Sequence, residues 1–203
     1  LSTIILIAGS IFFVWPADHA EAAACTSAAS GDWATAATWA SPCNVTGGPV
    51  AGDTVTIASG HTITISTTVA ATSITINNAG VATGINMTGG SLTLSSTLTC
   101  SAPSSAATTT IAVGARSLTA SGITINGGST SRICLMTVGA GGSITTTSAG
   151  LTFAGTAAQA QFTGNASATF NLTGTMGSGG TMTTNSMNIV ATGTSAINQA
   201  KTF

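Results

Sequence analysis

SLTLSSTLTC at residues 91–100 holds two short segments in which Leu alternates with Ser or Thr. This two-residue period is typical of β-strands with one buried face. The first triplet recurs as Ser-Leu-Thr at 117–119 and as Ser-Ile-Thr at 143–145, each time 26 residues further along the chain. The constant spacing indicates an internal repeat. It favours stacked coils over a sandwich, because only stacking in register imposes a fixed repeat length.

Each repeat contains three strand-like segments. The second segments occupy residues 97–100, 122–125 and 150–153, and the third occupy 109–113, 133–138 and 160–163. Glycine pairs precede first segments in GGSLTL (89–94), GGSITT (141–146) and GGTMTT (179–184). Glycine there permits the positive φ of a sharp corner. The sequence therefore predicts an all-β protein, a parallel β-solenoid of about six triangular coils with a repeat of about 26 residues.

Three segments make up the predicted chain. Residues 1–24 form an apolar N-terminal arm or signal segment, residues 25–44 form a cap that contains Trp33 and Trp39, and residues 45–203 form the solenoid. The cap departs from the repeat and precedes the first strands. We therefore expect it to cover one end of the stack, where unpaired backbone groups would otherwise accept further strands.

The chain is almost without charge. Asp, Glu, Lys and Arg make up 3% of its residues, against about a quarter in typical soluble domains. Only Arg116, Arg132 and Lys201 are basic and the net charge is −1, so no basic surface can neutralise phosphates and nucleic acid is excluded as a partner. A surface without charge also lacks the repulsion that keeps copies apart, which favours self-association.

The N-terminal arm has two interpretations. As an export signal it is removed, since AEAAA before Cys25 offers small residues for cleavage, and it meets the membrane only during export. As a retained arm it is too short for a comfortable span of about 20 residues, and its apolar side chains must be buried, most simply in a neighbouring subunit. The apolar side chains are those of Ile4, Ile5, Leu6, Ile7, Ile11, Phe12, Phe13, Val14 and Trp15.

Four cysteines follow the arm, at positions 25, 43, 100 and 134. An even number after an export-like segment indicates an oxidising compartment and two disulfides. Three pairings are open, of which we prefer Cys25 with Cys43 and Cys100 with Cys134. Zinc is the alternative, but the chain has no CxxC and no histidine at a useful spacing from the cysteines.

Asp53 and His61 are the one candidate catalytic pair, eight residues apart on neighbouring strand-like segments. They act either as a carboxylate and imidazole pair or, as we prefer, as residues of two turns. Residues 54–203 contain no Asp or Glu, so the clustered carboxylates of solenoid lyases, hydrolases and calcium sites are missing there. We therefore predict no catalytic residue, metal or cofactor.

Four Asn-X-Ser/Thr sequons are candidate glycosylation sites, although such triplets also arise by chance in a chain rich in Asn and Thr. They begin at Asn44, Asn86, Asn165 and Asn171.

GDWATAATW (31–39) followed by AGDTVTIASGHTITI (51–65) resembles the segment that leads into the coils of bacterial extracellular β-solenoid surface and adhesin-like proteins. The strand pair is also similar to that of G8-type modules. The resemblance covers residues 25–76 and implies a solenoid on an outer surface. The apolar N-terminus is more weakly similar to pilin-type filament subunits, but Ile5 stands where pilins carry an acidic residue.

These observations predict a non-enzymatic structural subunit of a secreted filament or surface fibre, located outside the cell or on its surface. Copies of the chain would polymerise by end-to-end stacking of coils and by burial of the arm in a neighbour. The alternative is a surface adhesin whose solenoid presents Thr, Asn and Trp33 or Trp39 to surface glycans.

Overall fold

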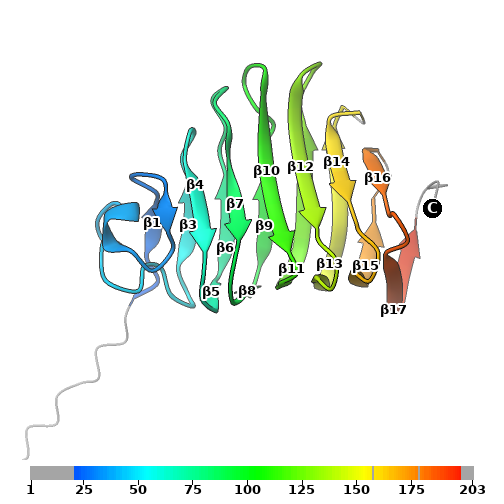
Figure 1. Ribbon diagram of the computed structural model, residues 1–203, viewed down its shortest axis with the longest axis horizontal. Helices are drawn as coiled ribbons and strands as arrows, with labels where there is room; N and C mark the ends of the chain where they lie inside the picture. The colour runs from blue at the N-terminus through cyan, green and yellow to red at the C-terminus, as the bar shows by residue number, and fades with distance from the viewer. Residues whose placement is uncertain (1–20, 157, 178, 198–203) are drawn as a thin grey trace, which may run out of the picture.

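The computed structural model describes residues 21–156, 158–177 and 179–197, which form a parallel β-solenoid (Figure 1). Strands account for 55% and helix for 2% of the chain, which confirms the predicted fold. The solenoid makes about five turns, so the predicted count of about six is not confirmed. Residues 1–20, most of the N-terminal arm, lie outside the described residues.

One wall of the solenoid is a seven-stranded parallel sheet, which we call the β10 face. Buried and more exposed residues alternate along most of its strands, so that one side of these strands faces the interior. Its strands are β2 (Gly31–Asp32), β4 (Thr62–Ile65), β7 (Thr83–Met87), β10 (Ala107–Gly114), β12 (Arg132–Val138), β14 (Ala160–Thr163) and β16 (Thr181–Thr183).

The second sheet has ten strands and bends into two further faces. The β6 face contains β1 (Ala24–Thr26), β3 (Thr54–Ile57), β6 (Ser73–Ile76) and β9 (Thr97–Cys100), and the β8 face contains β5 (Val69–Ala71) and β8 (Ser91–Leu94). Four longer strands cross the corner and belong to both faces: β11 (Ser117–Gly127), β13 (Ser143–Gly155), β15 (Thr169–Met176) and β17 (Asn188–Ile197).

The register of β11 shows how the corner arises. Its first half pairs with β8 and its second half with β9, on either side of a shift between Ala120 and Gly122. A coil therefore contributes a strand to each of three faces, as the three segments per repeat predicted. The glycine pairs stand at corners with positive φ, for example Gly141 at 76°.

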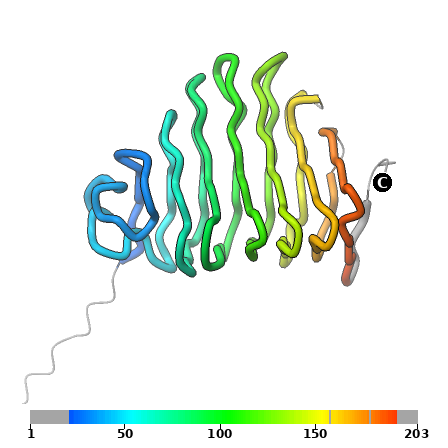
Figure 2. The backbone as a smooth tube through the Cα atoms, viewed as in Figure 1, coloured from blue at the N-terminus to red at the C-terminus, as the bar shows by residue number. Residues whose placement is uncertain are grey.

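The predicted repeat holds in the middle of the stack. Ser91, Ser117, Ser143 and Thr169 stand opposite one another in successive coils, and the bonded pair Ser117 and Ser143 lies 26 residues apart. The last coil is shorter, since Thr173 meets Thr192 after only 19 residues. Shorter coils at both ends give the solenoid the tapered outline in Figure 2.

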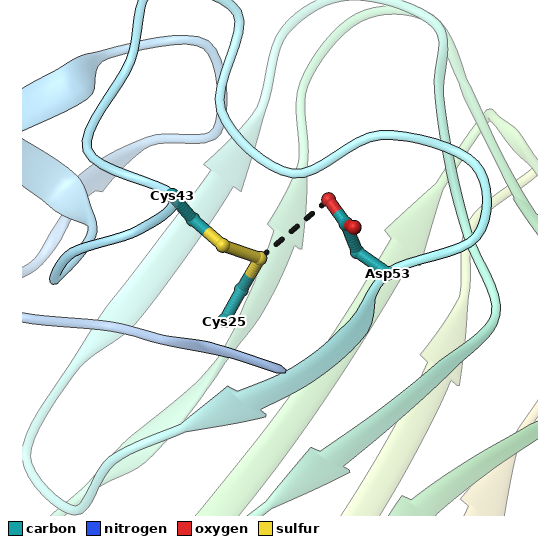
Figure 3. Close-up of side chains that lie close together, drawn as sticks. All are labelled: Cys25, Cys43 and Asp53. Carbon is teal, nitrogen blue, oxygen red and sulfur yellow. Dashed lines mark hydrogen bonds between the residues drawn. A yellow bond between two sulfur atoms is a disulfide. The ribbon is translucent and has the colours of Figure 1, made fainter. Parts of the chain in front are cut away.

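The N-terminal cap comprises residues 27–50, whereas the sequence predicted 25–44; residues 25 and 26 belong to strand β1. The Ala28 amide donates to the Thr38 carbonyl and the Ala40 amide to the Thr26 carbonyl, both at 2.8 Å, so the cap occupies the outer edge of β1. The Cys25–Cys43 disulfide fastens the cap to this strand (Figure 3). The short helix η1 (Ala36–Thr38) lies within the cap.

Two tryptophans fill the interior of the cap. The rings of Trp33 and Trp39 meet edge to face with centroids 5.1 Å apart. Trp33 Nε1 donates to the Pro49 carbonyl at 3.0 Å and Trp39 Nε1 to the Trp33 carbonyl at 2.7 Å. Each ring therefore buries a large apolar area while its polar hydrogen is satisfied.

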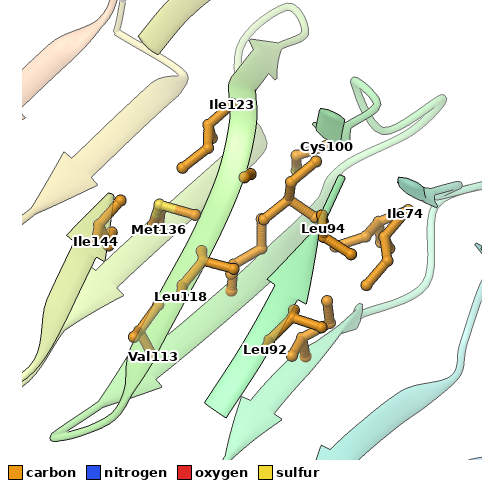
Figure 4. Close-up of a cluster of buried hydrophobic side chains, with 14 of the residues drawn as sticks. Ile74, Leu92, Leu94, Cys100, Val113, Leu118, Ile123, Met136 and Ile144 are labelled. Atoms are coloured by element: carbon orange, nitrogen blue, oxygen red, sulfur yellow. The ribbon is translucent and has the colours of Figure 1, made fainter. Parts of the chain in front are cut away.

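Apolar side chains form continuous ladders inside the solenoid, because equivalent positions of successive coils stack in register (Figure 4). On the β8 face, Leu118 lies between Leu92 and Ile144. The ladder of the β10 face runs through Ile63, Ile85, Ile111, Met136, Phe162 and Met182. The Cys100–Cys134 disulfide crosses this core from the β6 face to the β10 face.

Replacing Ile111 with Ala should lower the free energy of unfolding by about 2–5 kcal/mol, because the side chain is 1% exposed and its ladder cannot close over the cavity. Urea unfolding followed by circular dichroism measures the loss. Thr110→Ala, on the outward side of the same strand, is the control and should change stability by no more than about 0.5 kcal/mol. Equal effects of the two variants would contradict the ladder.

Candidate functional site

Acid–base catalysis and ion binding require ionisable side chains. The described part of the chain holds few of them: Glu21, Asp32, Asp53, His61, Arg116 and Arg132. Among these, only Asp53 is buried, at 6% exposure. It lies beside the Cys25–Cys43 disulfide, where the cap meets the first coil (Figure 3). This junction is the best candidate for a site with buried polar chemistry.

Asp53 binds backbone on both sides of the junction. Its Oδ1 accepts from the Ala23 amide and its Oδ2 from the Val50 amide, each at 2.8 Å. Oδ2 also lies 3.6 Å from Sγ of Cys25. This contact is not a hydrogen bond, because a disulfide sulfur carries no hydrogen. The carboxylate thus joins the segment before β1 to the end of the cap, and both of its oxygens are occupied.

His61 has a different partner. Its Nδ1 lies 2.8 Å from Oγ of Ser27, which also accepts from the Ala58 amide at 2.9 Å. Asp53 and His61 therefore engage separate groups, the geometry that the structural interpretation of the pair predicts. The contact of Ser27 with His61 could not be predicted from the sequence, because the two residues are 34 positions apart and Ser27 belongs to no motif. With Ser27 only 4% exposed, its hydroxyl ties the turn after β3 to the cap and is not presented to a substrate.

The cysteines pair as preferred, Cys25 with Cys43 and Cys100 with Cys134. Ligand atoms of Cys25, Cys43 and Asp53 lie within 4.8 Å of one another. Zinc requires thiolate sulfur, and both of these sulfurs are bonded to each other. The cluster is a structural junction.

Both cap tryptophans are inaccessible, Trp33 at 0% and Trp39 at 2% exposure. The suggestion that either one is presented to sugars is wrong, because a ring that stacks on a sugar must have an open face. The burial of these two rings could not be predicted from the sequence. The cap lacks the alternation of apolar and polar residues that identifies inward positions in the coils.

The candidate glycosylation sites differ in accessibility. Asn44, Asn86 and Asn165 are exposed. Asn171 is half-buried, and its Nδ2 donates to Oγ1 of Thr145 at 3.3 Å. The first three are therefore sterically better placed to accept a glycan.

No family model, curated protein or solved structure matches the chain. The resemblances to G8-type modules, extracellular solenoids and pilin-type subunits thus stay predictions. The helical part of the described chain is too short and insufficiently apolar to cross a membrane.

Asp53→Ala should destabilise the protein by about 1–3 kcal/mol in all, because the partly buried amides of Ala23 and Val50 lose their acceptor. Asp53→Asn keeps one acceptor oxygen and should recover part of the loss. Urea unfolding measures both variants. Asp32→Ala is the matched control, because Asp32 is half-buried and its carboxylate accepts only from the Ala34 amide among the bonds described. A loss no larger for Asp53→Ala than for Asp32→Ala would contradict the role of the junction.

Alkylation should label no cysteine in the native, unreduced protein, even after unfolding in urea, because all four are in disulfides. Reduction in urea should expose four reactive thiols, counted by mass spectrometry. Under reducing conditions without urea, labelling should be slow, because all four residues are at most 4% exposed. Labelling before reduction would refute the pairing.

Proposed function

We propose that this protein is a non-enzymatic structural subunit of a secreted filament or surface fibre. The observation that carries the proposal is the difference between the two ends of the solenoid. One end is closed by the disulfide-fastened cap, while the described residues place no strand on the outer edge at the other end. Among the described residues, the cap covers the edge at one end of the stack and no strand covers the edge at the other, an asymmetry that supports directional contact between copies.

Among the described strands at the C-terminal side, β16 pairs with β14 and β17 pairs with β15. The last apolar side chains there are less covered than those of the central coils: Met182 is 6% and Met187 7% exposed, and Ile189 is partly buried against the core. We call Met182, Met187 and Ile189 the apolar rung. A parallel strand edge beside such a set of apolar side chains is a template for another strand. A further strand would also cover this rung.

The cap changes how such a contact would form. Because it occupies the outer edge of β1, direct stacking of one subunit's last coil on another's first coil would meet the cap and not a strand edge. The N-terminal arm is the segment that can supply the missing strand, since nine apolar side chains lie between Ile4 and Trp15. We therefore assign the contact to the arm of one copy and the edge of β17 in the next.

Composition and covalent chemistry support the same proposal. The near absence of charge removes electrostatic repulsion between copies. Two buried disulfides are consistent with an oxidising location outside the cytosol. The occupied oxygens of Asp53, the separate partner of His61 and the lack of any Asp or Glu after residue 53 all favour a structural over a catalytic role.

Negative-stain microscopy of the full chain at neutral pH should show filaments, and Ile189→Lys should abolish them. The substitution places a charge in the apolar rung that the next strand would cover, and burying an unpaired charge is strongly unfavourable. Val190→Lys is the control, because Val190 faces outward on the same strand and is 37% exposed. This variant should still assemble.

Phe12→Lys in the full chain tests the arm separately and should also prevent assembly. A wild-type protein that stays monomeric in the microscope would overturn the proposal. A monomer that binds a glycan array would favour the adhesin alternative.

A further inference from the structure

The outer surface of the β6 face carries an unbroken row of threonines. One threonine from each of six successive strands stands opposite the next in parallel register, and no bulge interrupts the row. The row consists of Thr26, Thr56, Thr75, Thr99, Thr124 and Thr152. Figure 1 shows the strands of this face side by side along the long axis of the solenoid. The row therefore runs along most of the stack.

A second, shorter row lies beside the first. Thr54, Ser73 and Thr97 each precede a row threonine by two residues, with one buried residue between them. The backbone positions that carry these hydroxyls are about 4.8 Å apart between neighbouring coils and about 6.6 Å apart along one strand. Strands β3, β6 and β9 therefore present a grid of six hydroxyl groups with two regular repeat distances.

The hydroxyls of this grid are not used inside the protein. In the described part of the chain, no side-chain hydroxyl of the two rows makes an intramolecular hydrogen bond, whereas hydroxyls of the β8 face and its corner bond to each other. Ser117 meets Ser143 at 2.9 Å and Ser121 meets Ser148 at 2.7 Å. The β6 face therefore offers its donors and acceptors to an external partner.

The grid is also rigid and neutral. Threonine is branched at Cβ, so few rotamers are available and the hydroxyl and methyl positions repeat along the row. None of the ionisable groups described above points outward from β3, β6, β9, β11 or β13 on this face; Asp53, next to β3, is buried. The complementary partner is uncharged, periodic and able to donate and accept hydrogen bonds at many points at once.

We propose that the β6 face binds the surface of an ice crystal. Water in hexagonal ice is held in a fixed oxygen lattice, and one of its repeats on a prism face is close to the spacing between successive coils of the grid. The spacing along a strand is somewhat shorter than the second repeat, so the match is closest along the row. Threonine hydroxyls can join that lattice while the intervening methyl groups pack over its voids. A crystalline polysaccharide fits less well, because sugar rings stack on exposed aromatic side chains and every aromatic residue in the described ranges is buried: Trp33, Trp39, Phe153, Phe162 and Phe170.

The proposal stands independently of filament formation, since the grid is complete within one copy. Filament assembly would extend the number of hydroxyls that act together, but binding by a monomer requires only the β6 face. The strand edge of β17, which carries the proposed function, contributes nothing to the grid.

The full chain should adsorb to a growing ice hemisphere and produce thermal hysteresis with shaped crystals, measured against serum albumin as the inert protein. Thr75→Tyr with Thr99→Tyr should reduce both signals to the albumin level, because two bulky rings at the centre of the row prevent contact with a flat lattice. Thr137→Tyr with Thr163→Tyr is the matched control on the β10 face, where these two threonines are also paired and half-buried. It should retain the wild-type signals.

Circular dichroism spectra and melting curves establish that the variants fold, and Thr124→Tyr tests the same row at another coil if the double variant does not. A wild-type signal equal to that of albumin would overturn the proposal. Equal losses in the β6-face and β10-face variants would also overturn it. Sedimentation of the wild type with cellulose or chitin powder, lost in the β6-face variant, would assign the grid to a polysaccharide and reject ice.

Discussion

Parallel stacking in register is the constraint on which the rest of the structure depends. An inward side chain such as Leu118 is buried only because Leu92 and Ile144 occupy the same position in the coils on either side. A slip of one residue would turn the leucines outward and the threonines inward. On the β8 face the central coils therefore keep a spacing of 26 residues. Differences in coil length are absorbed at the corners, as in the register shift between Ala120 and Gly122 of β11.

Stacking of coils leaves backbone N–H and C=O groups of the outermost strands without strand partners. The described residues differ at the two ends in whether other groups cover these strands. At the first coil, the cap provides backbone partners, and the Cys25–Cys43 disulfide and Asp53 fasten it from two directions. At β17, the described residues contain no such element. Within the described residues, the first coil is therefore held by contacts that have no counterpart at β17.

The order of the inward side chains also fixes the order of the outward side chains. Ile74, Leu98 and Ile123 stack in one ladder, so the residues that follow them, which point the other way, must stack as well. Hydroxyl residues at those outward positions then become rows with a constant spacing. A regular surface thus follows from the same repeat that builds the core, and it needs no specific contacts between the outer side chains.

The sequence by itself determined the all-β class, the solenoid, the positions of most strands in the coils and the length of the central repeat. These properties are visible because alternation and periodicity are local patterns that each coil must obey. Only the tertiary structure decided which of three cysteine pairings forms, that Ser27 and not Asp53 contacts His61, and that the cap tryptophans are buried. Those outcomes depend on contacts across the cap and between coils, which join residues far apart in the chain. No repeating pattern in the sequence identifies the partners of such contacts.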